Sequence, residues 1–212
     1  MEKYKKQLLV LRSQLIGAGF SNALIALEKG LKYHKGKRKG GDPEFSHQVS
    51  IALFALTLPG IKCMERLICV ILLHDVREDY DVSHEELVSW FPDRAFGLLV
   101  AHSVENMTKV FRKVRKDDTQ VFAALGEDEC GSLAKLCDRI HNLQSMAGVF
   151  TLEKQKAYIE EVFEHFYPML KEAKRNFPWH TNAYENIKWM IQSQIDLLQH
   201  IHKALEANNA AV

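Results

Sequence analysis

The chain has 212 residues, of which 47% are hydrophobic and 26% are charged, and its formal net charge is +1. These values are ordinary for a soluble globular protein, and the length suits one compact domain over residues 1–212. A net charge near zero gives no overall attraction to nucleic acid or to a membrane surface, so neither is expected as a partner. The longest apolar run, residues 67–73, is too short to cross a bilayer.

The cysteines and the first residues indicate the cellular compartment. Arg12 interrupts the apolar stretch that follows the N-terminal lysines, so a signal peptide is not expected. Four cysteines lie in helix-like or apolar surroundings and form no CxxC pair: Cys63, Cys69, Cys130 and Cys137. We therefore expect reduced, buried thiols in a cytoplasmic protein, and the spacing does not support a cysteine-ligated zinc site.

The first third of the chain predicts three helices. Ser21 is a candidate N-cap, because apolar residues follow it at helical intervals up to residue 31. A loop with glycines and a proline precedes a second helix over residues 46–58, which Pro59-Gly60 ends. Residues 61–75 predict a third helix, which is strongly apolar and is therefore expected at the centre of the fold.

The rest of the chain predicts more helices and no strands. Ser83 and Glu86 form a capping-box pattern at the start of a short helix, and residues 94–110 predict the next one. Residues 111–131 are polar and are expected to be the most mobile segment. Further helices are predicted over residues 133–146, 153–176 and 183–207. The last of them carries one apolar stripe, and the predicted fold class is all-α.

An imidazole and three carboxylates follow the most apolar segment. His74 and Asp75 come directly after it, and Glu78 and Asp79 follow one helical turn later. Ionised groups beside a buried segment are costly unless a partner compensates them. A divalent cation is a common partner, and it makes a bound water a usable nucleophile near neutral pH. The sequence predicts an active site here, with Glu78 and Asp79 orienting or deprotonating that water.

Two other segments supply candidate ligands. Asp138, His141 and Asn142 stand at i, i+3 and i+4, so they share one helix face next to apolar residues. This setting favours an inward-pointing Asp138. His47 begins an apolar helix and would, on its own, be an ordinary helix-end histidine.

Basic stretches flank the acidic centre over residues 32–39 and 109–116. Each could be a solvated charged loop. Clustered lysines and arginines beside a metal site are, however, also typical ligands of phosphate groups. The stretches are therefore candidates for phosphate binding.

Four ordered motifs resemble those of the RelA/SpoT family, HD-domain metal phosphohydrolases that degrade ppGpp and pppGpp. The family segment RKSGEPYIxHP is similar to residues 38–47, and its HDVxED motif is similar to residues 74–79. Its VTK element is similar to residues 107–109, and KLADRLHNxxxM to residues 135–146. The resemblance covers about residues 20–170, followed by the predicted C-terminal helix over about 183–207.

The resemblance implies a helical HD domain that removes the 3′-pyrophosphate from ppGpp or pppGpp. It implies one manganese ion, held by His47, His74, Asp75 and Asp138. It implies Glu78 and Asp79 as the catalytic pair, and substrate binding by Arg38, Lys39, Lys109 and Asn142. The synthetase and regulatory domains of long family members have no counterpart here, which implies a stand-alone small hydrolase.

Departures from the family pattern lie near the expected substrate. Glu44 stands where tyrosine is usual, Gln48 replaces proline, and Tyr80 replaces threonine. An HD phosphohydrolase for another nucleotide (an adenine alarmone, a deoxynucleoside triphosphate or NADPH) therefore stays open. A non-catalytic protein that binds nucleotides or a toxin partner is a further alternative, against which the retained Glu78 and Asp79 argue. The oligomeric state stays open.

Overall fold

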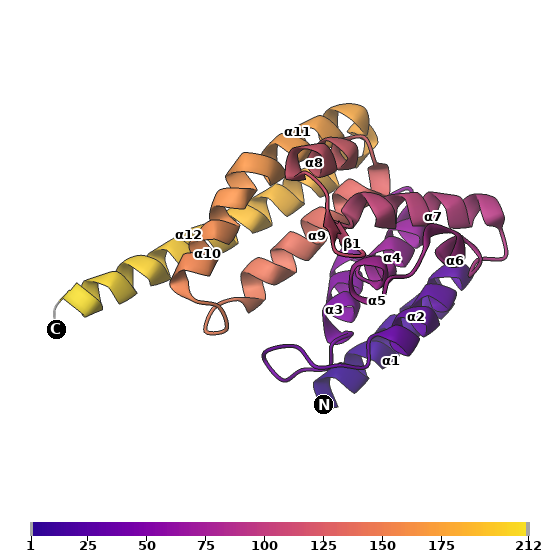
Figure 1. The fold of residues 1–212 in the computed structure, drawn as a ribbon, viewed down its shortest axis with the longest axis horizontal. Coiled ribbons are helices and arrows are strands. Elements are labelled where there is room, and N and C mark those ends of the chain that lie inside the picture. Colours follow the sequence, from indigo (N-terminus) through magenta and orange to yellow (C-terminus); the bar gives the residue numbers. More distant parts are fainter. Residues whose placement is uncertain (1, 211–212) are drawn as a thin grey trace.

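The computed structural model describes residues 2–210, which form helices and one small hairpin (Figure 1), so the predicted all-α fold class is confirmed. The first helices are α1 (Glu2–Gly17), α2 (Ser21–Tyr33), α3 (Ser46–Ala55) and α4 (Met64–Leu73). They are followed by α5 (Val76–Tyr80), α6 (His84–Val88) and α7 (Arg94–Met107).

The hairpin of β1 (Val110–Phe111) and β2 (Val114–Arg115) leads into the second group of helices. These are α8 (Asp118–Gly126), α9 (Glu129–Ser145), α10 (Leu152–Glu161), α11 (Tyr167–Asn176) and α12 (Thr181–Ala210). A π-helical turn, Val162–Phe166, joins α10 to α11 without a break. In Figure 1, α9 lies between the first group and the other helices of the second group. Helix α12 extends beyond the other helices toward the C-terminus.

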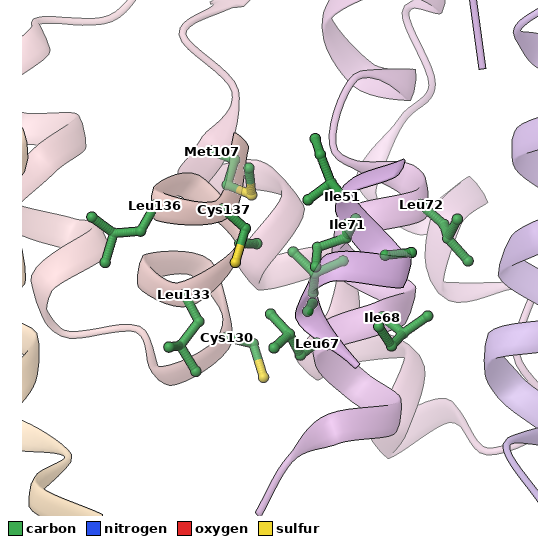
Figure 2. Packing of buried hydrophobic residues seen from close by; sticks show 14 of the residues in the cluster. Ile51, Leu67, Ile68, Ile71, Leu72, Met107, Cys130, Leu133, Leu136 and Cys137 are labelled. Carbon is green, nitrogen blue, oxygen red and sulfur yellow. The ribbon is translucent and has the colours of Figure 1, made fainter. Parts of the chain in front are cut away.

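Helix α4 is the centre of the core, as its apolar sequence predicts. Every side chain from Leu67 to Leu73 is buried, because α4 is in contact with α2, α3, α7 and α9. Figure 2 shows Leu67 and Ile71 of α4 facing Leu133 and Cys137 of α9 across one of these interfaces. Because α4 lies at the centre of the core, His74 and Asp75, which follow it directly, lie next to the core.

The helix predicted over residues 61–75 is shorter than expected. It begins at Met64 and ends at Leu73, and His74 and Asp75 form a turn before α5. Helix α3 likewise ends at Ala55 rather than at residue 58, and Ser21 is the first residue of α2 rather than its cap. The predicted cap at Ser83 is confirmed, since its side chain accepts a hydrogen bond from the Glu86 N–H at 3.1 Å.

Residues 111–131, expected to be the most mobile segment, contain regular secondary structure. They form the end of β1, then β2 and α8, and the turn residues Arg112 and Lys113 have φ values of 49° and 68°. Asp117 caps α8 by accepting a hydrogen bond from the Gln120 N–H at 3.1 Å. The helix buries Val121, Phe122 and Leu125. A short helix with one buried face therefore lies in a segment for which the sequence analysis predicts no helix.

The apolar stripe of α12 is buried over its first part and open at its end. Ile187, Ile191 and Ile195 are fully buried, whereas 38% of Ile201 and 49% of Leu205 are exposed. We expect the whole stripe to pack on the body of the protein or on a partner subunit; its inner half packs on the other helices, and its outer half is exposed in the single chain. Among the described residues, every helix is too short or too polar to cross a membrane.

Candidate metal centre and adjoining pocket

His47, His74 and Asp138 converge from three different parts of the chain. They come from the first turn of α3, the turn after α4 and the middle of α9. All three are buried, and one ligand atom of each lies within 4.8 Å of the others. His47 Nε2 lies 2.8 Å from Asp138 Oδ1, and His74 Nε2 lies 4.0 Å from the same oxygen. The fold thus brings together three of the four residues predicted as metal ligands.

Asp75, the fourth predicted ligand, lies on the open side of this cluster. Its Oδ2 is 3.1 Å from His74 Nε2, so the two neighbours in the sequence are also paired in space. The same oxygen accepts a hydrogen bond of 2.7 Å from Gln48 Nε2, and Gln48 is itself buried. Asp75 therefore has one side toward the histidines and one side toward an open pocket.

The electrostatics of the cluster favour a bound cation. Burial disfavours a charged His74, but Asp75 and Asp138 outweigh it and raise the His74 pKa to about 9. Burial also opposes ionisation of Asp138, yet His47 and His74 hold its pKa well below the ordinary value. The neighbouring histidines likewise lower the pKa of Asp75, so both carboxylates are ionised at neutral pH and need positive charge next to them. A divalent cation would supply that charge and release protons as it binds.

Hydrogen bonds behind the two histidines orient their ring nitrogens. His74 Nδ1 lies 2.8 Å from the Ile71 carbonyl oxygen, which directs Nε2 toward the carboxylates. His47 Nδ1 lies 2.9 Å from His141 Nδ1. Burial, followed by the positive charges of His47 and Arg38, lowers the His141 pKa to about 4, so this ring is neutral. Outer partners of this kind are typical of metal-ligating histidines, and the donor set fits a divalent cation. The sequence places His141 on this face but assigns it no role.

A pocket of about 430 Å³ opens beside Asp75. Arg38 and Lys39, both predicted to bind substrate, line it, together with the acidic side chains of Asp75 and Asp79. Two further lysines line it, Lys37 and Lys154, as do Val149 and Phe150. The Lys154 Nζ lies 4.0 Å from the centre of the Phe150 ring. A pocket with basic groups, an aromatic ring and an acidic wall suits a phosphorylated ligand with an apolar ring.

Asp79 and Glu78 have different surroundings. Asp79 reaches the pocket, where partial burial and the charges of Asp75, Glu78 and Glu44 raise its pKa to about 6. A carboxyl group that titrates near neutrality is suited to take a proton from water. The Glu78 carboxylate accepts a hydrogen bond of 3.2 Å from the Lys109 main-chain N–H. Both predicted catalytic carboxylates thus lie on α5, directly beyond the ligand turn.

The other two predicted substrate-binding side chains do not line the pocket. Asn142 Nδ2 donates a hydrogen bond of 2.9 Å to Asp138 Oδ1. The Lys109 Nζ lies 2.6 Å from a Glu161 carboxylate oxygen and 3.3 Å from one of Asp118. In this conformation Asn142 holds a candidate ligand, and Lys109 contacts Glu78 through its main chain rather than through its charge.

Two departures from the family pattern lie against each other. The Tyr80 hydroxyl donates a hydrogen bond of 2.8 Å to Glu44 Oε2. The same oxygen accepts a hydrogen bond of 2.9 Å from the Gly36 N–H. Glu44 therefore fastens the loop that carries Arg38 to α5, and the two replacements form one contact.

Comparisons with known proteins relate the chain to alarmone enzymes. It is 32% identical over 146 residues to the GTP pyrophosphokinase rsh of Brucella melitensis, covering 65% of this chain and 18% of that protein. It is 32% identical over 143 residues to the guanosine-3′,5′-bis(diphosphate) 3′-pyrophosphohydrolase of Aquifex aeolicus, covering 65% of this chain and 19% of the relative. A GTP pyrophosphokinase of Streptomyces antibioticus is 27% identical over 168 residues, 76% of this chain and 18% of that protein.

The chain thus spans less than a fifth of the length of these relatives. No family model matches it. The order of the four motifs and the similarity to these named proteins nevertheless agree, and together they confirm that the chain resembles the RelA/SpoT-type HD hydrolases.

Proposed function

We propose that this protein is a metal-dependent hydrolase that removes the 3′-pyrophosphate from ppGpp or pppGpp in the cytoplasm, with residues 1–212 forming one HD domain. The observation that carries the proposal is the buried cluster of His47, His74 and Asp138 next to a pocket with basic walls. The printed activity of the Aquifex aeolicus relative supports the choice of substrate.

The proposed metal ligands are His47, His74, Asp75 and Asp138, and the proposed ion is Mn²⁺. Imidazole nitrogens mixed with carboxylate oxygens suit manganese, iron or zinc, and the resemblance to the family favours manganese. When bound, the ion polarises the phosphoryl group on the 3′ oxygen and makes a water more acidic. Gln48 and Asn142 hold the carboxylates of Asp75 and Asp138 by the hydrogen bonds described above.

Asp79 and Glu78 handle the protons of the reaction in this proposal. Asp79 reaches the pocket and has a pKa of about 6, so it is largely ionised at neutral pH and takes a proton from the attacking water. Glu78, fixed by the Lys109 main chain, orients the same water. The bond between phosphorus and the 3′ oxygen breaks, and this oxygen takes the proton that Asp79 received and becomes the hydroxyl of GDP or GTP.

Arg38 and Lys39 bind the substrate by charge and by stacking. Both line the pocket, where they would neutralise phosphate oxygens and contact the purine. Lys37 and Lys154 lie in the same lining and add positive charge that the substrate's phosphates require.

The test is a nucleotide panel with identification of the products. The protein is incubated with Mn²⁺ and, separately, with ppGpp, pppGpp, an adenine alarmone, deoxynucleoside triphosphates and NADPH, and the products are identified by mass spectrometry. We expect GDP or GTP and pyrophosphate from the guanosine alarmones. Asp138→Asn should lose both bound metal and activity, because it replaces a carboxylate ligand by a neutral amide. Release of single phosphates only, or full activity in Asp138→Asn, would contradict the proposal.

The second candidate is a hydrolase for a different nucleotide. The observation in its favour is Glu44, a carboxylate that lines the pocket where the family usually has tyrosine. A carboxylate beside the substrate changes which hydrogen-bond donors on a base are accepted. Preference for another member of the nucleotide panel would support this second candidate in place of the guanosine alarmones.

A further inference from the structure

Two cysteines, Cys63 and Cys130, lie together at the N-terminal ends of α4 and α9. Cys63 directly precedes α4, which leads to His74, and Cys130 lies in the first turn of α9, which carries Asp138. Their sulfur atoms are 3.1 Å apart. Figure 2 shows Cys130 on the α9 side of the core, at the level of Leu67. The pair is distant in sequence and is formed by the packing of α4 against α9.

Polar side chains surround this cysteine pair. Arg66 Nε donates a hydrogen bond of 3.0 Å to Cys130 Sγ, and the same guanidinium pairs with Glu129. Glu129 also accepts hydrogen bonds from Trp179 Nε1 at 2.7 Å and from His180 Nε2 at 2.9 Å. The His180 Nε2 lies 3.9 Å from Cys63 Sγ. The pair therefore has the Arg66 cation beside Cys130 and a proton acceptor, the His180 ring, near Cys63.

The same cluster has the donor types of a metal site, but its charge is already balanced. One ligand atom each of Cys63, Glu129 and His180 lies within 4.8 Å of the others. The Arg66 guanidinium, however, already pairs with the Glu129 carboxylate and donates a hydrogen bond to Cys130. A divalent cation would add further positive charge beside this arginine, so thiol chemistry suits the arrangement better than metal binding.

The two thiols differ in their access to solvent. Cys63 is half-buried and lines a surface pocket of about 570 Å³. Cys130 is fully buried, and this burial raises its pKa well above the ordinary value although Arg66 acts in the opposite direction. A reagent in solution therefore meets Cys63 first, and Cys130 lies behind it as the second thiol.

We propose that Cys63 and Cys130 are a redox modification site that forms a reversible disulfide with a hydroperoxide as the oxidant. The Cys63 thiolate attacks one peroxide oxygen and the O–O bond breaks, which gives a sulfenic acid. The departing hydroxide or alkoxide takes up the proton that the Cys63 thiol had lost and leaves as water or an alcohol. The Cys130 sulfur then attacks the Cys63 sulfur and the S–O bond breaks. The released hydroxide takes the Cys130 proton and leaves as water. The two sulfurs together lose two electrons, and the peroxide gains them.

The disulfide requires little movement and ties the two central helices together. The sulfurs approach from 3.1 Å to the bonded distance of roughly 2.05 Å. The bond closes a long loop of the chain, residues 63–130, which removes conformational freedom from the unfolded state. Oxidation should therefore raise the melting temperature, on the order of 5–10 °C for a domain of this size. This inference does not rest on the proposed enzymatic function.

The test compares reduced and peroxide-treated full-length protein. After treatment with hydrogen peroxide, non-reducing proteolysis and mass spectrometry should yield one cross-linked peptide pair, joined through Cys63 and Cys130. The melting temperature should rise and return to its original value with dithiothreitol. Cys63→Ser, at the half-buried position, should fold normally and show neither change. Cys69→Ala, which alters a buried cysteine of α4 outside the pair, should keep both changes.

Three results would overturn the proposal. The first is sulfinic or sulfonic acid at Cys63 without any cross-link. The second is a cross-link through Cys69 or Cys137. The third is zinc in the purified protein that Cys63→Ser releases, because the cluster would then be a metal site.

Discussion

The Nδ1 atoms of His47 and His141 lie 2.9 Å apart, and His141 is the only contact that reaches this side of the His47 ring among the hydrogen bonds of the described residues. Coordination through His47 Nε2 requires the ring proton on Nδ1, where the neutral His141 accepts it. His141→Phe keeps an aromatic ring but removes the acceptor. We expect it to weaken metal binding by roughly 10–100-fold in a Mn²⁺ titration.

The matched control for this change is His200→Phe. His200 is an exposed histidine of α12, so its replacement should leave the metal affinity unchanged. Wild-type affinity in His141→Phe would show that His141 does not hold His47 in its ligating form.

Asp79 should couple activity to pH. Its pKa is raised from 3.8 to about 6 by burial and by neighbouring carboxylates, so hydrolysis should decline as the pH falls below about 6. Asp79→Asn should lower kcat by about 10²–10⁴-fold and change KM little, because it removes the proton acceptor. Asp81→Asn is the control, since Asp81 is exposed and asparagine tolerates its positive φ.

The raised pKa of Asp79 should also make the stability of the folded protein depend on pH. A carboxyl whose pKa is raised on folding stabilises the folded state while it is protonated, and this contribution is lost as the pH rises from 3.8 to about 6. Asp79→Asn should therefore increase the melting temperature at pH 7.5 but not at pH 4. An Asp79→Asn protein that is inactive and also less stable at pH 7.5 would indicate a structural role instead.

Arg38 should contribute to binding rather than to the chemical step. It lines the pocket beside Lys39 and is not one of the candidate metal ligands. Arg38→Ala should raise KM by roughly 10–100-fold, the range for one charge-assisted hydrogen bond, and leave kcat within a few-fold of wild type. Lys35→Ala removes an exposed charge from the same basic stretch without touching the pocket, and both constants should stay as in wild type. A fall in kcat alone for Arg38→Ala would contradict a binding role.

The two halves of the α12 stripe should differ in their effect on stability. Ile195→Ala empties a fully buried position and should lower the free energy of unfolding by about 2–5 kcal/mol. Leu205→Ala changes a side chain that is 49% exposed and should have an effect within about 0.5 kcal/mol. Urea denaturation measures both. Equal losses would mean that the outer half of the stripe is covered in solution, for instance by a partner chain.

Sequence patterns predict the local elements of this fold well. The continuous apolar run from Leu67 to Leu73 predicts the central helix, because a helix that is apolar on all sides must be buried. The spacing of Asp138, His141 and Asn142 predicts their shared face on α9. The short helix α8 is missed because its apolar run, residues 121–125, is brief and lies between strongly polar stretches.

Contacts between distant segments are harder to predict, since they depend on how the helices pack. The hydrogen bond from Gln48 to Asp75 and the contact of Cys63 with Cys130 have no local signature. Glu44 and Tyr80 each read as an isolated departure from the family pattern, although they form one hydrogen bond in the fold. The sequence therefore predicts the candidate ligands and leaves out the residues that hold them.

Hydrolysis of ppGpp in ¹⁸O-labelled water tests the central claim most directly. In the proposed reaction, water attacks the phosphorus bonded to the 3′ oxygen, so the label should enter the pyrophosphate and the GDP should contain none. Asp138→Asn should form neither product. Labelled GDP, labelled orthophosphate as the first product, or unchanged ppGpp with the wild-type protein and Mn²⁺ would contradict the proposed function.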